Sequence, residues 1–264
     1  YNGSENFAKG KRFGFFPSIA LGWLISEEHF MEPARDIMSK LKLRASIGSV
    51  GNDNIGGRRF AYITTINSKA SGYNWGYTGD TYRDGVQEGE VGVENLTWEK
   101  ALKMNLGLEI GLWNELDLQL DFFKERRTSI FMQRATIPTQ IGFINNPYAN
   151  YGKVDNKGVD VALNYNKRFN KDWNISFRGT FTYAKNTIIE RDEPESIKGT
   201  YRSITGRSIN TLWGLQAEGL FTEDDFENGK LKEGIPVPQL GSEVRPGDIK
   251  YSDMNNDGYI TAAD

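Results

Sequence analysis

The sequence contains no cysteine and only one histidine, His29. The absence of cysteine excludes disulfides, zinc–thiolate sites and cysteine nucleophiles. A single histidine leaves little basis for a histidine-based metal site or for a serine–histidine–aspartate triad. Because no activated nucleophile and no paired acid and base can be named, the sequence predicts that the chain is not an enzyme.

The chain also lacks an excess of positive charge and any long hydrophobic run. Lysine and arginine number 32 against 35 aspartate and glutamate residues, for a net charge of −3. Without a basic stripe, nucleic acid is not an expected partner. No window approaches roughly 18 consecutive apolar residues, which excludes a transmembrane helix. Membrane β-strands stay open, because they carry a much weaker signal.

Glycine and aromatic residues, by contrast, are plentiful. Of 264 residues, 29 are glycine and 12% are aromatic, while 38% are hydrophobic. Low apolar content together with many aromatics is not typical of disorder and favours many strands and turns. The chain starts at Tyr1 without an initiator methionine, so we expect it to be a fragment of a longer protein.

The strongest signal is strict alternation of apolar and polar residues. The even positions of 104–112 are Met104, Leu106, Leu108, Ile110 and Leu112, and the odd positions are polar or glycine. Leucine or phenylalanine likewise occupies the even positions of 116–122, around Asp117, Gln119 and Asp121. A period of two is that of a strand with two different faces. With the polar Asn114-Glu115 between them, the two runs predict an antiparallel hairpin.

The same alternation recurs elsewhere, so about six strands are predicted. The further strands are 15–25, 41–47, 159–165 and 173–183. Lengths of roughly 9–11 residues suit tilted strands that cross a bilayer. The connections 26–39, 114–115 and 167–172 are short or compact, whereas 51–98, 125–154 and 188–264 are long and polar. Short turns on one rim and long loops on the other are typical of an outer-membrane barrel.

Three tryptophans support this interpretation, because Trp23, Trp113 and Trp173 fall at strand ends beside the short turns, where an interfacial belt would lie. We therefore predict an all-β fold, an antiparallel up-and-down transmembrane β-barrel. Six strands cannot close around a useful lumen and open edges are forbidden in lipid, so the segment must be incomplete. Residues 1–187 would supply strands, and 188–264 an extracellular loop region. A soluble β-sandwich, which also alternates, is the alternative.

Several blocks resemble the SusC/RagA-type TonB-dependent transporters of Bacteroidota outer membranes. The blocks are Arg12-Phe13-Gly14-Phe15-Phe16-Pro17-Ser18, Leu41-Lys42-Leu43-Arg44-Ala45-Ser46, Asn95-Leu96-Thr97-Trp98-Glu99-Lys100, Asn156-Lys157-Gly158-Val159 and Pro246-Gly247-Asp248-Ile249-Lys250-Tyr251. They keep the family's order along almost the whole chain.

The resemblance implies that the chain is part of a 22-stranded barrel in the bacterial outer membrane, with lipid against its apolar face. It implies energised import of oligosaccharides or peptides, with a SusD-like surface lipoprotein as partner over the long loops. The plug and the contact to TonB would belong to a missing N-terminal part. The chain alone is therefore not expected to transport.

One segment predicts a calcium site. Residues 253–264 match the twelve-residue loop D-x-[DN]-x-[DN]-G-x₅-[DE]. The ligands would be Asp253, Asn255, Asp257, the Tyr259 carbonyl, Thr261 and Asp264. Asp at the twelfth position reaches less far than the usual Glu, so a structural Ca²⁺ of lower affinity is expected. The alternatives are a plain Asn/Asp-Gly turn or, if the sheet is a soluble sandwich, a calcium-stabilised glycan-binding domain.

Residues 60–82, within the long loop 51–98, are rich in aromatic residues. The candidate contact residues for substrate or partner are Tyr73, Trp75, Tyr77 and Tyr82. Aromatic faces stack on sugars, so glycan contact is one reading. Loop anchoring or contact with the partner lipoprotein is the other.

Overall fold

The computed structural model describes residues 1–241 and 243–264. The chain forms two compact units, residues 1–209 and residues 210–264. Among the described residues, no helix has the length and apolar character needed to cross a membrane.

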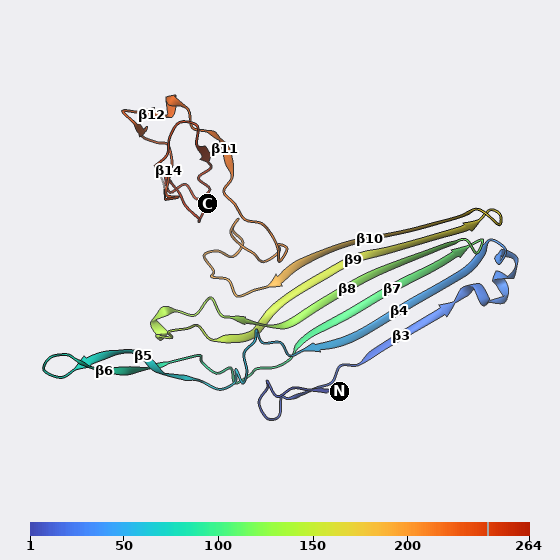
Figure 1. Cartoon of the computed structure of the whole chain (residues 1–264), viewed down its shortest axis with the longest axis horizontal. Coiled ribbons are helices and arrows are strands. Elements are labelled where there is room, and N and C mark those ends of the chain that lie inside the picture. The colour runs from blue at the N-terminus through green and yellow to red at the C-terminus, as the bar shows by residue number, and fades with distance from the viewer. Residues whose placement is uncertain (242) are drawn as a thin grey trace. The chain divides into compact units, whose positions relative to one another are not determined.

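A single six-stranded antiparallel sheet dominates the first unit (Figure 1). Its strands are β3 (Ser18–Leu24), β4 (Met38–Asn52), β7 (Glu99–Leu112), β8 (Leu116–Gln133), β9 (Tyr148–Arg168) and β10 (Asn174–Glu190). Their order in the sheet is β10-β9-β8-β7-β4-β3, so each strand pairs with the next one along the chain, apart from a hairpin inserted between β4 and β7. The predicted all-β, up-and-down arrangement is confirmed.

Most of these strands are longer than the alternation predicted. The expected long loop at 125–154 was largely wrong, because β8 and β9 continue through it until Gln133 pairs with Tyr148. After Phe123, polar side chains occur on both faces of β8, so alternation fades while backbone pairing persists. The last strand of the sheet, β10, continues to Glu190, three residues beyond the predicted end of the strand region at residue 187.

The sheet has one apolar face and one polar face. Cross-strand register places apolar residues opposite one another over all six strands. One such row contains Trp23, Leu43, Leu108, Leu120, Val161 and Phe181. The opposite face carries charged residues, amides and glycine, as in the row of Arg44, Gly107 and Asp121.

The apolar stretch shifts steadily along the strands from one edge of the sheet to the other. Trp23 lies at the end of β3, and its row reaches Phe181 on β10. On β10 the alternation continues six positions further toward the short turns, from 181 to 175. Such a stagger is required of strands that tilt around a barrel axis. The apolar face therefore forms a band that runs oblique to the strands.

The short connections gather at one end of the sheet. The β3–β4 connection contains two 3₁₀ helices, η1 (Ile25–Glu27) and η2 (His29–Ala34). The β7–β8 turn places Trp113 and Asn114 at positive φ. In the β9–β10 turn, the Asn170 side chain accepts the backbone N–H groups of Asp172 and Trp173. All three predicted rim tryptophans lie at this end and are exposed.

The other end of the sheet carries the long segments and the buried core. These include β1 (Asn2–Gly3), β2 (Phe13–Gly14), the hairpin of β5 (Ile66–Trp75) and β6 (Thr81–Glu88), and η3 (Thr139–Ile141). A cluster of Phe7, Ile55, Leu96 and Trp98 is buried here. Phe16 packs its ring edge against Trp98 and lies where a side chain at Gly51 would be. Glycine at position 51 therefore lets the chain before β3 fold over β4.

The second unit is built from short strand pairs. These are β11 (Ala217–Leu220) with β15 (Ile249–Tyr251), β12 (Phe226–Glu227) with β13 (Lys230–Leu231), and β14 (Val237–Pro238) with β16 (Tyr259–Ile260). The 3₁₀ helix η4 (Glu223–Asp225) begins with a reciprocal cap between Thr222 and Asp225. Among the described residues of this second unit, Phe221 and Ile260 are the buried hydrophobic ones.

Candidate functional site on the polar face and the long segments

An ion-pair chain crosses the middle of the polar face. The Glu109 carboxylate on β7 lies 2.5 Å from Lys40 Nζ and 2.7 Å from Arg44 Nε, both on β4. Arg44 Nε makes no hydrogen bond with any described residue, so its contact with Glu109 is an ion pair alone. Arg44 also donates from Nη2 to both oxygens of Asp121 on β8, at 3.1 Å. Three neighbouring strands are thus joined by alternating charges.

Gly107 makes this chain of charges sterically possible. It lies between Arg44 and Asp121 in the register, on the strand that separates them. A Cβ at position 107 would be 2.6 Å from Asp121 Oδ1 and 3.0 Å from the Arg44 guanidinium. The missing side chain lets the arginine reach across β7. Glycine on the polar face therefore has a packing role rather than a turn role.

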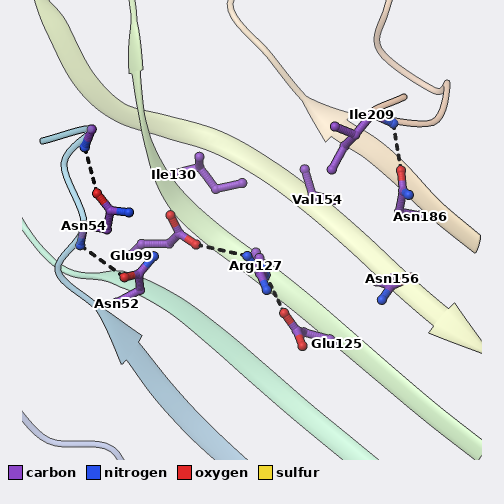
Figure 2. A pocket seen from close by; sticks show the side chains of 11 residues that line it. Asn52, Asn54, Glu99, Glu125, Arg127, Ile130, Val154, Asn156, Asn186 and Ile209 are labelled. Atoms are coloured by element: carbon purple, nitrogen blue, oxygen red, sulfur yellow. Dashed lines mark hydrogen bonds and ion pairs between the residues drawn. The ribbon is translucent and has the colours of Figure 1, made fainter. Parts of the chain in front are cut away.

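A second charged cluster lies nearer the long segments. Glu125 on β8 is paired with Arg127 and lies 3.5 Å from Lys103. Arg127 in turn lies 3.7 Å from Glu99 on β7. Figure 2 shows Glu99, Glu125 and Arg127 of this cluster projecting from β7 and β8 into one open pocket.

The pocket has a volume of about 500 Å³ and a mixed lining. Carboxylates and a guanidinium meet the apolar side chains of Ile130, Val154 and Ile209. The amide side chains in its wall are Asn52, Asn54, Asn156 and Asn186. The side-chain oxygens of Asn52, Asn54 and Asn186 each accept a hydrogen bond from a backbone N–H group. Such a wall can hydrogen-bond a polar ligand and pack against its apolar parts.

A buried carboxylate fixes the start of the β8–β9 connection. Asp192, just after β10, accepts hydrogen bonds from Arg134 Nε at 2.8 Å and from the backbone N–H groups of Ala135 and Thr136 at 2.6 and 3.1 Å. The Thr136 hydroxyl donates to its other oxygen at 2.7 Å. Burial raises the pKa of Asp192, but these donors outweigh burial and hold the pKa well below its usual range.

The aromatic residues predicted to contact substrate or a partner lie at the free end of the β5–β6 hairpin. Tyr73 and Trp75 are 70% and 60% exposed and pack edge to face at 5.7 Å. They share one face of β5, because they are two residues apart. Tyr77 is in the turn and fully exposed, and the Tyr82 hydroxyl accepts the N–H of Gly72 at 2.8 Å. The hairpin therefore presents an aromatic tip to solvent.

The predicted calcium loop is closed by its own backbone. Asp253 Oδ2 accepts the Gly258 N–H, and Asp257 Oδ1 accepts the Tyr259 N–H, each at 2.8 Å. Asn255 Oδ1 likewise accepts the Asp257 N–H at 2.8 Å. Gly258 has a φ of 82°, as the sharp turn at the sixth position requires.

The end of the loop folds back onto its start. Asp264 accepts the N–H groups of Thr261 and Met254, at 2.8 and 3.2 Å, and the bond from Thr261 is the main cause of its lowered pKa. Asp253 Oδ1 is buried and has no hydrogen-bond partner among the described residues. Within that part of the chain, no group of three His, Asp or Glu side chains is arranged to hold a metal ion.

Sequence reasoning found the polar face but missed its ion pairs. Asp117, Gln119 and Asp121 share that face, as their spacing predicted. Arg44, Glu109 and Glu99 were not singled out, because their partners lie on other strands. The sequence does show opposite charges at alternate positions of neighbouring strands. Which of these charges form pairs depends on how the strands align, and the alignment is known only from the structure.

A two-faced meander with short turns at one end and long segments at the other is the wall of an up-and-down β-barrel. A family model described as TonB dependent receptor-like, β-barrel, matches residues 1–260. The chain belongs to this family.

Named relatives agree with the resemblance seen in the sequence. The chain is 33% identical over 263 residues to the TonB-dependent receptor SusC of Bacteroides thetaiotaomicron, which covers 95% of the chain and 26% of SusC. It is 30% identical over 294 residues to TonB-dependent receptor P39 of Formosa agariphila, covering 99% of the chain and 27% of P39. The chain thus spans about a quarter of the length of the curated relatives it matches.

Solved structures show the same fold. The RagAB peptide importer in the 'closed-closed' state matches with a TM-score of 0.69 at 22% identity, over 97% of the chain and 26% of that structure's chain. The 'open-open' state matches with a TM-score of 0.58 at 28% identity, over 71% and 19%.

The Asp192 contacts give a pH-dependent prediction. Because the folded carboxyl has a pKa below its ordinary value of 3.8, its stabilisation is full above that pH and is lost as the pH falls through the folded pKa. Asp192→Asn should weaken the contacts at every pH above 4, by roughly 1–3 kcal/mol. Hydrogen exchange at Ala135 and Thr136 in the full-length protein measures this loss.

The matched control is Asp172→Asn in the exposed β9–β10 turn, which should leave exchange at Ala135 and Thr136 unchanged. Equal protection in the Asp192→Asn variant and the unaltered protein would contradict the account.

Proposed function

We propose that this chain forms part of the barrel wall of a SusC-type TonB-dependent transporter in a bacterial outer membrane. The whole protein would import oligosaccharides or peptides, with a surface lipoprotein over the long segments. Energy would come from TonB, through parts of the protein outside this segment. The chain's own role is to hold a polar surface toward the lumen and is not catalytic.

The exposed apolar face is the observation that carries this proposal. Leu21, Phe122 and Phe181 are 71%, 55% and 61% exposed, although they lie in the middle of regular strands. A β-sandwich would bury such a face against a second sheet, so the soluble alternative is not favoured. In lipid the same exposure is favourable, because acyl chains replace water against these side chains.

The polar face supports a polar substrate. The pocket near Glu99 and Arg127 offers both signs of charge, amides and an apolar patch within about 500 Å³. Oligosaccharides and peptides both combine hydrogen-bonding groups with apolar surface, so this lining suits either class. The protein named in the matching structures is a peptide importer.

The aromatic tip of the β5–β6 hairpin supports a partner at the long-segment end. Tyr73 and Trp75 present a rigid apolar surface with polar edges, and such residues are enriched at protein interfaces. We assign this tip to contact with the lipoprotein or with substrate held between the two proteins.

The first test uses the tagged full-length protein in its parent organism. Fractionation should place it in the outer membrane, and purification in detergent should recover a surface lipoprotein with it. Deleting the gene should abolish growth on the imported oligosaccharide or peptide as sole carbon source. A soluble product with no barrel in detergent would overturn the proposal.

Substitutions in the hairpin test the same proposal more sharply. Tyr73→Ala/Trp75→Ala should lower lipoprotein recovery or substrate uptake several-fold, because it removes the exposed aromatic pair. Ile66→Ala/Val86→Ala removes exposed apolar residues from the same hairpin, outside its aromatic pair, and should change neither. Equal behaviour of the two double variants would remove the hairpin from the interface.

We also propose that residues 253–264 bind a structural calcium ion. The support is the unpartnered, buried Asp253 Oδ1, which a cation would satisfy, together with the positive φ of Gly258. Asp253, Asn255, Asp257, the Tyr259 carbonyl, Thr261 and Asp264 would hold it. The carboxylates now accept backbone N–H groups, and the last ligand is the shorter Asp, so the site would be weak, roughly 10⁻⁴–10⁻³ M.

Isothermal titration of the full-length protein with calcium tests this assignment. Asp257→Ala should abolish the uptake attributed to this loop, because it removes one carboxylate ligand. Asp224→Asn, an exposed change in the same unit, should leave uptake as it was. If the Asp257→Ala variant takes up as much calcium as the unaltered protein, the loop is a plain turn.

A further inference from the structure

Three lysines lie side by side at the edge of the apolar face. Lys124 on β8 pairs in register with Lys157 on β9, and Lys157 pairs with Lys185 on β10. They share the face of Phe122 and Tyr183, which lie two residues nearer the short turns on β8 and β10. On β7 the same row carries Met104, so the basic row is confined to β8, β9 and β10.

The lysines form no ion pair with any described residue, and all three are exposed. The neighbouring Arg126 is held by Asp155, through two hydrogen bonds of 2.7 and 2.6 Å. Three lysines and Arg126 face a single carboxylate, that of Asp155, so these five side chains keep a net positive charge. Like charges placed directly opposite each other destabilise a sheet. This row therefore carries a cost that an anion would remove.

The row lies where the apolar band meets the polar zone on the long-segment side. On β10 the apolar positions from Ile175 to Tyr183 cover about 27 Å of strand, or roughly 20 Å of height after tilting. That approaches the ~25 Å apolar height of an outer-membrane barrel. In such barrels the longer loops are extracellular, so the row would meet the headgroups of the outer leaflet.

We propose that Lys124, Lys157 and Lys185 bind the phosphate groups of an anionic glycolipid in the outer leaflet. This inference rests on the proposed outer-membrane location. Adjacent strands lie about 4.8 Å apart, so the three lysines span roughly 10 Å, enough to receive two phosphates of one headgroup. The apolar residues directly beside the row, Phe122 and Tyr183, give the acyl chains a surface, which free phosphate does not need.

The test compares three forms of the full-length protein in dodecyl maltoside micelles doped with diphosphoryl lipid A. These are the unaltered protein, the triple variant Lys124→Gln/Lys157→Gln/Lys185→Gln, and the control Lys9→Gln/Lys69→Gln/Lys171→Gln. The control removes three exposed lysines outside the apolar face. Native mass spectrometry counts the bound lipid, and heat-modifiable gel mobility reports a folded barrel.

Each lysine near a charged surface contributes roughly a five-fold effect on binding. If the three effects multiply, the triple variant should bind lipid A about a hundred-fold less tightly, while the control binds as the unaltered protein does. Raising the salt concentration should weaken binding to the unaltered protein. If the triple variant does not fold, Lys157→Gln alone, at the centre of the row, should still show the roughly five-fold loss.

Equal lipid A binding by the triple variant and the control would overturn the inference. Inorganic phosphate that displaces lipid A at equal concentration would overturn the lipid assignment. The unaltered protein could also form a folded barrel in the outer membrane and yet bind lipid A no more tightly than the triple variant does. That result would overturn this inference alone and leave the proposed function standing.

Discussion

Backbone hydrogen bonding between neighbouring strands is the constraint on which the rest of this structure depends. Lipid offers no partners for N–H and C=O groups, so a membrane wall must satisfy them within the sheet. Six strands pair here in one antiparallel sheet, with local register shifts in the β4–β7, β8–β9 and β9–β10 pairs. Once the ladder fixes the register, the period of two sends Leu118 and Leu120 to one side and Gln119 and Asp121 to the other.

The two faces then follow different rules. The apolar face needs only hydrophobic side chains. Tryptophans border it at the short-turn end, and Lys124, Lys157 and Lys185 border it on the long-segment side. The polar face needs specific partners, because Glu109 is buried and would otherwise be an unpaired charge. Lys40 and Arg44 supply those partners, and Gly107 leaves the space for Arg44 to reach Asp121 as well. The absence of a side chain at position 107 thus allows ion pairs to link β4, β7 and β8.

Local alternation was enough to predict the six strands of the sheet and the hairpin around Asn114, because alternation within one run reports both faces. The family was predicted from the ordered sequence blocks that resemble it. The β5–β6 hairpin was not predicted, because residues 51–98 were expected to form a loop. The extensions of β8 and β9 through 125–154 were not predicted. Lys124 and Arg126 are polar, although they share the face of β8 that is apolar from Leu116 to Phe122. The Arg44–Asp121 and Arg134–Asp192 pairs also escaped prediction, because they join residues 77 and 58 positions apart. The Gly258 turn was visible in the sequence as a motif, whereas the buried Asp253 Oδ1 was not.

The most direct measurement is a cysteine scan of β8. Because this segment contains no cysteine, single cysteines at 118, 119, 120 and 121 can each carry a nitroxide label in the full-length protein in lipid vesicles. The account predicts that labels at 118 and 120 collide mainly with oxygen dissolved in the bilayer, and that labels at 119 and 121 collide mainly with a water-soluble nickel chelate. Access of the chelate to all four positions, or no alternation, would contradict the assignment of the apolar face to lipid.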